Sequence, residues 1–401
     1  MTAREIRPPN TVDTVVVGAS AAGLATAACL IRAGVECALL EQAPHVGASW
    51  RGHYDRLHLH TSRGLSGLPF FPFPRHHPRY PARDQVVEYL EAYAAHFALR
   101  PHFGRRITRI TRDRAGATWI TRARVADGLD GREEMWRSRH VVVATGNARV
   151  PHRPGWLGEA HFGGAILHSG EYRNGEAFAG QRVLVVGVGN SGAEIALDLL
   201  EHGARPSLAV RSPVNIVPRD LLGVPIVACS IVLSLLPTEV ADAVAAAASR
   251  LRYGRLERLG FKKLPFGPAT QFQRLGRSPI IDVGTIAAIR RGDIAVVPAP
   301  VAYHPGVVEL QDGSRPAFDA VVLATGYRPA LEEFLAAPAG TATDTAGASF
   351  DHPFDREGLA EASGGELLPG LFLCGYRATV TGMLREIARD ARRIARDIAS
   401  R

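Results

Sequence analysis

The stretch RVLVV at residues 182–186, followed by GVGNSG at residues 187–192, decides the fold of this chain. The apolar, β-branched run predicts a strand of a parallel sheet that is covered on both faces. The Ala- and Leu-rich residues that follow, through Glu201, predict a helix, and SLAV at residues 207–210 predicts a second strand. We therefore predict a β-α-β unit, the building block of a dinucleotide-binding fold.

The turn between strand and helix carries the pattern G-x-G-x-x-G, formed by Gly187, Gly189 and Gly192. Backbone amides reach a pyrophosphate only where side chains are absent, and a helix start favours an anion. Asn190 and Ser191 lie inside this turn and are further candidates for contacts with the nucleotide. Because the motif follows a predicted strand and opens a predicted helix, we prefer a dinucleotide site to a tight turn that binds nothing.

An earlier segment repeats the same order of elements. The predicted strand is TVVV at 14–17, and the glycine turn GASAAG follows at 18–23. The predicted helix ends at Ala33, and the second strand is ECALL at 36–40. The glycine pattern here reads Gly18, Ser20 and Gly23, with serine at the middle position. Serine is the smallest polar substitute and still allows a close approach of the backbone, so we predict a second dinucleotide site.

The residue after the second strand distinguishes the two sites. Glu41 ends the first unit, where a carboxylate accepts hydrogen bonds from ribose hydroxyls and repels a 2′-phosphate. Arg211 ends the second unit, where a guanidinium suits the 2′-phosphate of NADP, although a plain surface charge is the alternative. We therefore expect FAD in the first site and NADPH in the second.

Two more predicted strands, 140–143 and 319–323, both run into Ala-Thr-Gly. The candidate cofactor-binding residues in these turns are Thr145, Gly146, Thr325 and Gly326. The arrangement predicts an α/β protein with two Rossmann-like dinucleotide-binding domains, the NADPH domain inserted in the FAD domain. The expected boundaries are 1–165 and 316–401 for the two parts of the FAD domain and 166–315 for the NADPH domain with an apolar substrate-side region.

The charge balance does not by itself indicate nucleic acid. The chain has 47 Lys and Arg against 39 Asp and Glu, a net charge of +8. Most basic residues are arginines that are scattered among acids, whereas a nucleic-acid site gathers them into one patch. We expect solvated surfaces that also favour anionic cofactors, and no nucleic-acid partner.

The four cysteines, Cys29, Cys37, Cys229 and Cys374, form no C-x-x-C pair and have no metal-ligand spacing. This excludes a redox disulfide of the thioredoxin-reductase kind, predicts no metal site and fits a reducing compartment such as the cytoplasm. The charged, proline-containing residues 1–10 are not a signal peptide. The apolar run at 221–236 is too short for a membrane span and contains Pro225, so we expect a buried helix near the substrate, with peripheral membrane contact as the alternative.

Two dinucleotide folds in one chain imply that a hydride moves from nicotinamide to flavin. Without a disulfide to take the electrons, the acceptor is molecular oxygen or a small organic molecule.

The segment FGGAILHSGEY at residues 162–172 resembles a known family fingerprint. It fits F-x-G-x-x-x-H-x-x-x-[W/Y], which is shared by flavin-containing monooxygenases and, in a Trp-ended form, by Baeyer–Villiger monooxygenases. The matching residues are Phe162, Gly164, His168 and Tyr172. Without the family match, the chemistry of His168 fits a histidine that is simply buried in the linker equally well.

Other blocks resemble the YUCCA flavin monooxygenases over nearly the whole chain. They are SWR at 49–51, YDRLHLH at 54–60, LPFFPFP at 68–74, GVGNSGAE at 187–194, DVGT at 282–285 and LATGY at 323–327. The resemblance implies a single-component class B enzyme that uses FAD, NADPH and oxygen. It also implies oxidative decarboxylation of a 2-oxo acid such as indole-3-pyruvate through a C4a-(hydro)peroxyflavin.

The resemblance also assigns residues. Trp50 and Arg51 match the pair that borders the flavin, and Gly382, in TVTGML at 379–384, matches a C-terminal glycine segment beside it. His60 stands where amine-oxidising relatives have an asparagine near the flavin. It is the candidate catalytic residue, able to donate to a peroxide oxygen or to steady NADP⁺, with a packing histidine as the alternative.

Three other functions remain open at this stage. Baeyer–Villiger insertion or N- or S-oxygenation of a small biosynthetic intermediate keeps the cofactors and changes the substrate. An NADPH oxidase or quinone reductase keeps the flavin reduction and drops the oxygenation. An NADPH-sensing module without catalysis would not oxidise NADPH.

Overall fold

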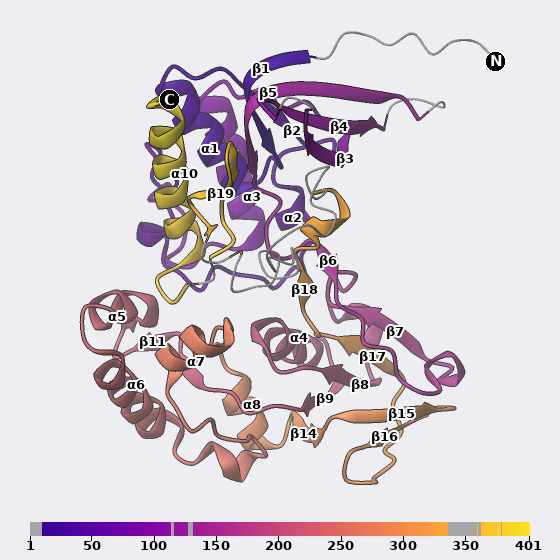
Figure 1. Ribbon diagram of the computed structural model, residues 1–401. Helices are drawn as coiled ribbons and strands as arrows, with labels where there is room; N and C mark the ends of the chain where they lie inside the picture. Colours follow the sequence, from indigo (N-terminus) through magenta and orange to yellow (C-terminus); the bar gives the residue numbers. More distant parts are fainter. Residues whose placement is uncertain (1–9, 114–115, 127–130, 336–358, 360–361, 378) are drawn as a thin grey trace, which may run out of the picture.

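A computed structural model describes residues 10–113, 116–126, 131–335, 359, 362–377 and 379–401. Residues 1–9, which make up most of the segment judged not to be a signal peptide, lie outside this range. Two sheets, each with its own helices, form two bodies that Figure 1 shows one above the other. This is the mixed α/β architecture expected from the two glycine turns.

The first body is built on a sheet with the order β19-β20-β5-β1-β2, to which β4 and β3 add an antiparallel extension. The strands are β1 (Asn10–Val17), β2 (Cys37–Leu40), β3 (Arg105–Arg112), β4 (Trp119–Val125), β5 (Glu133–Val143), β19 (Glu366–Leu368) and β20 (Leu371–Leu373). Val15 and Val16 on β1 face opposite sides and are both fully buried, as a strand covered on both faces requires.

Helices α1 (Ala21–Arg32), α3 (Arg83–His96) and α10 (Met383–Ala399) cover one face of this sheet, and α2 (Ala48–Arg51) lies near α3. Helix α1 is buried from Ala21 through Leu30 because it packs between the sheet and α10. Helix α10 is amphipathic, as its sequence predicts, and buries Ile387, Ile394 and Ile398.

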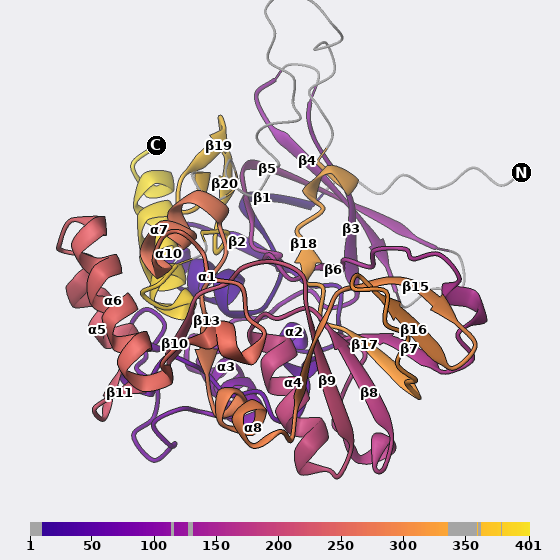
Figure 2. The ribbon, with the colours of Figure 1, turned by 90° about the horizontal axis from the view of Figure 1, so that it is seen from below.

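The second body has a parallel sheet with the order β14-β9-β8-β17-β7. Its strands are β7 (Ala165–His168), β8 (Arg182–Val186), β9 (Arg205–Val210), β14 (Ala295–Pro298) and β17 (Ala320–Leu323). Helices α4 (Asn190–Glu201) and α8 (Thr285–Arg291) lie on one side, and the hairpin of β15 (Pro300–His304) and β16 (Val307–Leu310) lies on the other (Figure 2). Tyr303 and Phe318 pack against β8 and β17 on that second side.

The chain passes between the two bodies twice, and the two passages pair with each other. Strands β6 (Val150–Pro151) and β18 (Tyr327–Arg328) are antiparallel, with Tyr327 opposite Pro151. Since β17 belongs to the second sheet, the return passage begins after Leu323.

A helical segment, α5 (Ile226–Leu233), α6 (Thr238–Tyr253) and α7 (Pro268–Leu275), follows β9. Two pairs of short strands accompany it: β10 (Ile216–Pro218) is parallel to β13 (Ile280–Asp282), and β11 (Asp220–Leu221) forms a hairpin with β12 (Val224–Pro225). Single-turn helices complete the structure: η1 (Arg63–Leu65), η2 (Glu159–His161), η3 (Glu176–Phe178), η4 (Leu256–Leu259) and η5 (Leu331–Glu333).

The prediction that residues 221–236 form one buried helix is wrong. The turn at Leu222 breaks the run, and Pro225 delays the helix start to Ile226. Leu222 is 97% exposed and Leu235 is 84% exposed, whereas Ile226 and Val227 are the buried residues of α5. Among the described residues, no helix is long and apolar enough to cross a membrane.

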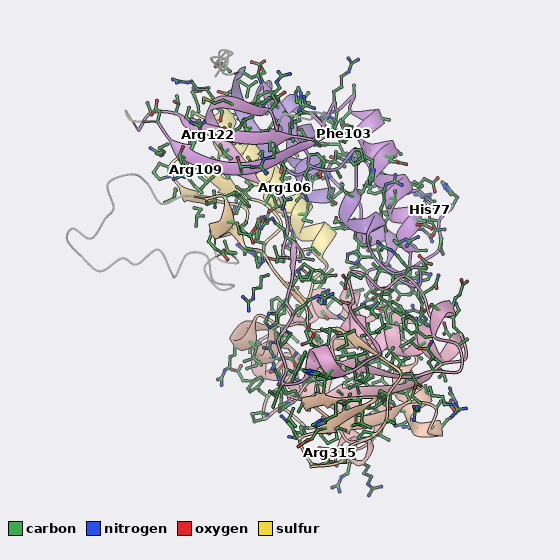
Figure 3. All side chains as sticks on the ribbon, turned by 90° about the vertical axis from the view of Figure 1, so that its right-hand side faces the viewer. His77, Phe103, Arg106, Arg109, Arg122 and Arg315 are labelled. Atoms are coloured by element: carbon green, nitrogen blue, oxygen red, sulfur yellow. The ribbon has the colours of Figure 1, made fainter. Side chains whose placement is uncertain are left out.

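The antiparallel extension of the first sheet places arginines opposite one another on neighbouring strands. Arg109 pairs directly with Arg122 across β3 and β4, and Arg106 pairs with Arg124. Figure 3 shows Arg106, Arg109 and Arg122 together on this extension. Strands β3, β4 and β5 thus form an antiparallel meander with charged side chains.

Candidate active site

The turn between β1 and α1 has no room for side chains at its two glycines. Gly18 has a φ angle of +102°, and a Cβ atom there would lie 2.8 Å from the carbonyl oxygen of Ala144. A Cβ atom at Gly23 would lie 1.7 Å from the carbonyl oxygen of Gly18. Ser20 begins α1 without capping it, and its hydroxyl lies 3.0 Å from that of Ser49. The first amides of α1 are therefore available to an anion.

Glu41 directly follows β2, and backbone amides fix its carboxylate. Oε2 accepts a hydrogen bond from the Ala19 N–H at 2.7 Å, and Oε1 accepts one from the Ala43 N–H at 2.9 Å. Each carboxylate oxygen keeps a second lone pair. Glu41 is thus oriented beside the first glycine turn and is able to accept a ribose hydroxyl.

The second turn, between β8 and α4, uses its three glycines differently. A Cβ atom at Gly187 would lie 2.6 Å from the Ala324 carbonyl oxygen, and one at Gly192 would lie 2.0 Å from the Gly187 carbonyl oxygen. A Cβ atom at Gly189 would meet nothing within 4 Å. Gly187 and Gly192 thus let α4 pack against the sheet, whereas Gly189 faces open space at an uncapped helix start.

The other residues of the second unit lie on both sides of this turn. The Asn190 side-chain oxygen accepts the Ile281 N–H at 2.8 Å, which ties the start of α4 to β13. Arg211 is exposed directly after β9, and no carboxylate pairs with it within the described part of the chain. An unpaired guanidinium at the end of this strand suits an anionic group on a nucleotide ribose.

Each Ala-Thr-Gly turn lies beside one glycine turn: Ala144 is next to Gly18, and Ala324 is next to Gly187. The Thr145 and Tyr376 hydroxyls lie 2.7 Å apart. Thr325 donates its hydroxyl proton to the carbonyl oxygen of His152. Gly146 and Gly326 both have positive φ angles, 77° and 86°, so each turn needs glycine at this position.

The linker motif is a structural device that holds the second of these turns. His168 is fully buried, accepts the Gly170 N–H at Nδ1 and donates from Nε2 to the Gly326 carbonyl oxygen at 3.0 Å. Burial lowers the pKa of His168 and keeps its imidazole neutral. The Tyr172 hydroxyl donates to the Asp198 carboxylate at 2.5 Å.

The other two linker residues also have packing roles. A Cβ atom at Gly164 would lie 2.3 Å from the Asp319 carbonyl oxygen. Phe162 is buried and packs edge-on against Tyr303. Phe162, Gly164, His168 and Tyr172 thus position the second body's loops and do not line the main cavity.

A cavity of about 840 Å³ lies between the two bodies and the helical segment. Residues 57–61, the start of α4, residues of α5, α6 and α7, and the segment before α10 line it. The predicted site residues that it brings together are Trp50, His60, Asn190, Ser191 and Gly382. Most of the lining is apolar, and no lysine or arginine is among the described lining residues.

The remaining predicted residues lie outside the lining of this cavity. They are Gly18, Ser20, Gly23, Glu41, Arg51, Thr145, Gly146, Gly187, Gly189, Gly192, Arg211, Thr325 and Gly326. Arg51 forms an ion pair with Glu91 on α3, and its side chain is partly exposed. These residues surround the two glycine turns and the loops next to them.

Sequence reasoning missed Glu194 as a functional residue. His60 Nε2 lies 2.7 Å from Glu194 Oε1, and the two side chains are 15% and 3% exposed. Glu194 also ends the GVGNSGAE block, on the first turn of α4 after the glycines. The signal was therefore present in the sequence, but nothing there indicates that His60, from the other body, is its partner.

Both glycine turns fit a dinucleotide. Each has an uncapped helix start, glycines at the points of closest packing, and either a carboxylate or an arginine after its second strand. The mostly apolar cavity that Trp50 lines also includes Asn190 and Ser191 of the second turn. The residues present thus match the chemistry that FAD and NADPH require: backbone amides for phosphates and hydroxyl acceptors for ribose.

Comparisons with known proteins identify the family of this chain. The profile of the family described as flavin-binding monooxygenase-like matches residues 12–340. The chain is 37% identical to indole-3-pyruvate monooxygenase YUCCA1 of Oryza sativa subsp. japonica over 99% of its own length and 93% of that protein.

Solved structures give the same result for the fold. A flavin-containing monooxygenase from Stenotrophomonas maltophilia is 26% identical with a TM-score of 0.67, covering 98% of this chain and 99% of that one. Cyclohexanone monooxygenase from Rhodococcus sp. Phi1, bound to NADP⁺, has a TM-score of 0.62 at 19% identity over 80% of this chain and 71% of that one. The latter likeness concerns the fold alone.

Proposed function

Because the chain belongs to the flavin-binding monooxygenase-like family, we propose that it uses FAD and NADPH to decarboxylate a 2-oxo acid oxidatively, with indole-3-pyruvate as the leading candidate. The observation that carries this proposal is the full-length similarity to an indole-3-pyruvate monooxygenase. The reaction consumes the 2-oxo acid, O₂, NADPH and a proton. It yields the shortened carboxylate, CO₂, NADP⁺ and water.

The two cofactors take the two glycine turns. FAD binds at Gly18, Ser20 and Gly23, with its adenosine ribose on Glu41. NADPH binds at the turn that contains Gly189, with Arg211 at the 2′-phosphate. This assignment rests on the opposite charges of Glu41 and Arg211, which favour a bare ribose and a phosphorylated ribose respectively.

The cavity between the bodies takes the substrate. When bound, reduced flavin supplies the electrons and the site of oxygen activation. The chain contributes an apolar enclosure that excludes water, with Leu57, Val217 and Ile226 among its walls. An aromatic ring such as indole gains hydrophobic contacts there, and His60 is the polar group that meets the oxygen-bearing end.

A second candidate is oxygen insertion next to a neutral ketone. It is favoured by one observation: the described cavity lining contains no lysine or arginine to pair with a carboxylate. On the first proposal, His60 and the nicotinamide of bound NADP⁺ meet the carboxylate. On the second, the substrate has no negative charge to neutralise.

The test is product analysis on the FAD-loaded protein with NADPH and oxygen. Indole-3-pyruvate, a neutral aryl ketone and a thioether are supplied separately, with NADPH oxidation and hydrogen peroxide measured in parallel. We expect CO₂ and indole-3-acetate in equal amounts, coupled to NADPH consumption. Because 2-oxo acids react with peroxide unaided, catalase is included in the product assays and left out of the separate reactions in which hydrogen peroxide is measured.

Other outcomes identify the alternatives. An ester from the ketone, with no CO₂ from the 2-oxo acid, would replace the proposal by Baeyer–Villiger insertion. Complete conversion of oxygen to hydrogen peroxide with every substrate would indicate an oxidase.

A further inference from the structure

His60 and Glu194 come from different bodies and meet at the cavity. His60 lies in the segment between α2 and η1, and Glu194 lies on α4. Their 2.7 Å contact joins His60 Nε2 to Glu194 Oε1, and both residues line the cavity. The contact is therefore both a bridge between the bodies and a part of the candidate substrate site.

The chemistry of this contact determines which imidazole nitrogen bears the proton. A carboxylate only accepts hydrogen bonds, so Nε2 must donate. Nδ1 is then the nitrogen left to face a ligand, and it meets a carbonyl or carboxylate oxygen only when it bears a proton as well, because both atoms otherwise only accept. No second hydrogen-bond partner of His60 is found among the described residues, so Nδ1 remains available to a ligand.

Because Glu194 is buried, its carboxylate depends on the hydrogen bond from His60, and the same hydrogen bond fixes the orientation of His60. Its side chain is 3% exposed, and His60 is its hydrogen-bond partner within the described range. A buried carboxylate without a donor is unfavourable, so Glu194 holds the imidazole as firmly as the imidazole satisfies Glu194. The other polar or charged groups near Glu194 are His53, Tyr54 and Arg56.

We propose that Glu194 is a positioning residue that fixes His60 through Nε2, so that Nδ1 is the atom that meets the oxygen-bearing end of the substrate. The position of His60 then depends on a residue of the nucleotide turn's own helix, because Glu194 follows Gly192 on α4. The substrate part of this inference rests on the proposed function, whereas the fixed imidazole does not.

The composition of the cavity supports the role. His58 is the other lining histidine, but it is exposed and its Nδ1 lies 2.7 Å from the Arg56 carbonyl oxygen. With no lysine or arginine among the described lining residues, His60 is the partly buried ring that a carbonyl or carboxylate oxygen would meet. Loss of its orientation should therefore affect substrate affinity.

The first measurement is ¹⁵N NMR of protein labelled at histidine, in the FAD-loaded form, with His60 assigned by the His60→Asn variant. We expect His60 to carry a proton on Nε2. The Glu194→Gln substitution should alter this pattern, because an amide both donates and accepts. Glu194→Asp, which keeps the carboxylate, should retain Nε2 protonation.

Glu201→Gln is the matched control. Glu201 also lies on α4 and joins the two bodies, through Arg56 at 2.8 Å, but it does not line the cavity. This variant should leave the His60 signals unchanged. A His60 that carries its proton on Nδ1 alone, or signals that are the same in Glu194→Gln and wild type, would overturn the proposal.

The second measurement separates the positioning role from the function. Glu194→Gln should raise the KM for the 2-oxo acid by about tenfold, the size of one hydrogen bond, while Glu201→Gln, outside the cavity lining, leaves it within about twofold of wild type. A KM within twofold of wild type would refute the role of Nδ1 toward substrate. If the NMR result holds but no 2-oxo acid is turned over by wild type, the proposed function fails and the positioning of His60 stands.

Discussion

Two glycines of the same turn should respond in opposite ways to the smallest possible side chain. In Gly192→Ala, the new Cβ would lie 2.0 Å from the Gly187 carbonyl oxygen and 3.3 Å from the Ala324 Cβ. Real Cβ atoms do not approach a carbonyl oxygen so closely, so α4 must move away from β8. Overpacking of this kind costs about 1–3 kcal/mol of unfolding free energy.

In Gly189→Ala the new Cβ meets no atom within 4 Å, and the φ and ψ angles of −106° and −171° are allowed for alanine. Stability should be unchanged or rise by about 0.4–1 kcal/mol, because alanine restricts the unfolded chain. The methyl group instead occupies the space that a pyrophosphate needs. Loss of one charge-assisted hydrogen bond, about 1.5–3 kcal/mol, corresponds to a roughly 10- to 150-fold weaker Kd for NADP⁺.

The assay combines thermal unfolding of each FAD-loaded variant with calorimetric titration of NADP⁺. Gly192→Ala should lower Tm by roughly 2–12 °C, at about 2–4 °C per kcal/mol, and Gly189→Ala should not lower it. Equal Tm values for both variants would refute the packing role of Gly192. Wild-type affinity of Gly189→Ala for NADP⁺ would refute the assignment of this turn to the nucleotide phosphates.

Three further predictions follow from the contacts of single side chains. Arg211→Ala should raise the KM for NADPH at least tenfold more than the KM for NADH, since NADH lacks the 2′-phosphate that the exposed guanidinium would meet; equal effects in steady-state kinetics would contradict the role. Burial lowers the pKa of His168 below its usual value of about 6.5, so the unfolded chain binds the proton first and stability falls as pH drops below about 6.5. Denaturant titrations should show His168→Asn losing less stability than wild type over that range, by up to about 1.4 kcal/mol per pH unit, and parallel pH profiles would contradict the prediction. Tyr172→Phe should lower the unfolding free energy by about 1–3 kcal/mol, because it removes the hydroxyl donor from the buried Asp198 carboxylate. The phenylalanine ring keeps the stack on Phe178. An unchanged denaturation midpoint would show that His202, 3.6 Å from Asp198, compensates.

The sequence was sufficient to predict both parallel sheets because their signals are local. The valine runs at 14–17 and 182–186 form β1 and β8, and the turn after each contains the glycines that its packing requires. The charged strands of residues 101–139 were also predictable, since alternation and turn residues mark an antiparallel extension. In each case the information lies within about ten residues of the element.

The apolar run at 221–236 was misread because its composition does not reveal what covers it. Hydropathy indicates burial, but Leu222 and Leu235 are exposed and do not line the cavity. The same limit explains why Glu194 was missed. Its acidic side chain on a helix next to a glycine turn has the pattern of a solvated residue, but it is buried where residues of the other body, including His60 and Tyr54, lie near it.

The segment from Tyr54 to His60 determines how the two bodies are joined. At the rim, Arg56 pairs with Glu201 through two hydrogen bonds of 2.8 and 2.9 Å, but Glu201 is 52% exposed, and such pairs contribute little. Further in, Tyr54 hydrogen bonds with Ser191 of the nucleotide turn, and burial raises the Tyr54 pKa well above its usual value, so that its hydroxyl stays neutral. At the cavity, the His60–Glu194 contact is nearly dry. The free-energy cost of breaking the contacts between the bodies therefore rises from the rim to the cavity. The inner contacts hold the nucleotide turn and the His60 imidazole in fixed positions beside the cavity, whereas water can replace the outer contacts.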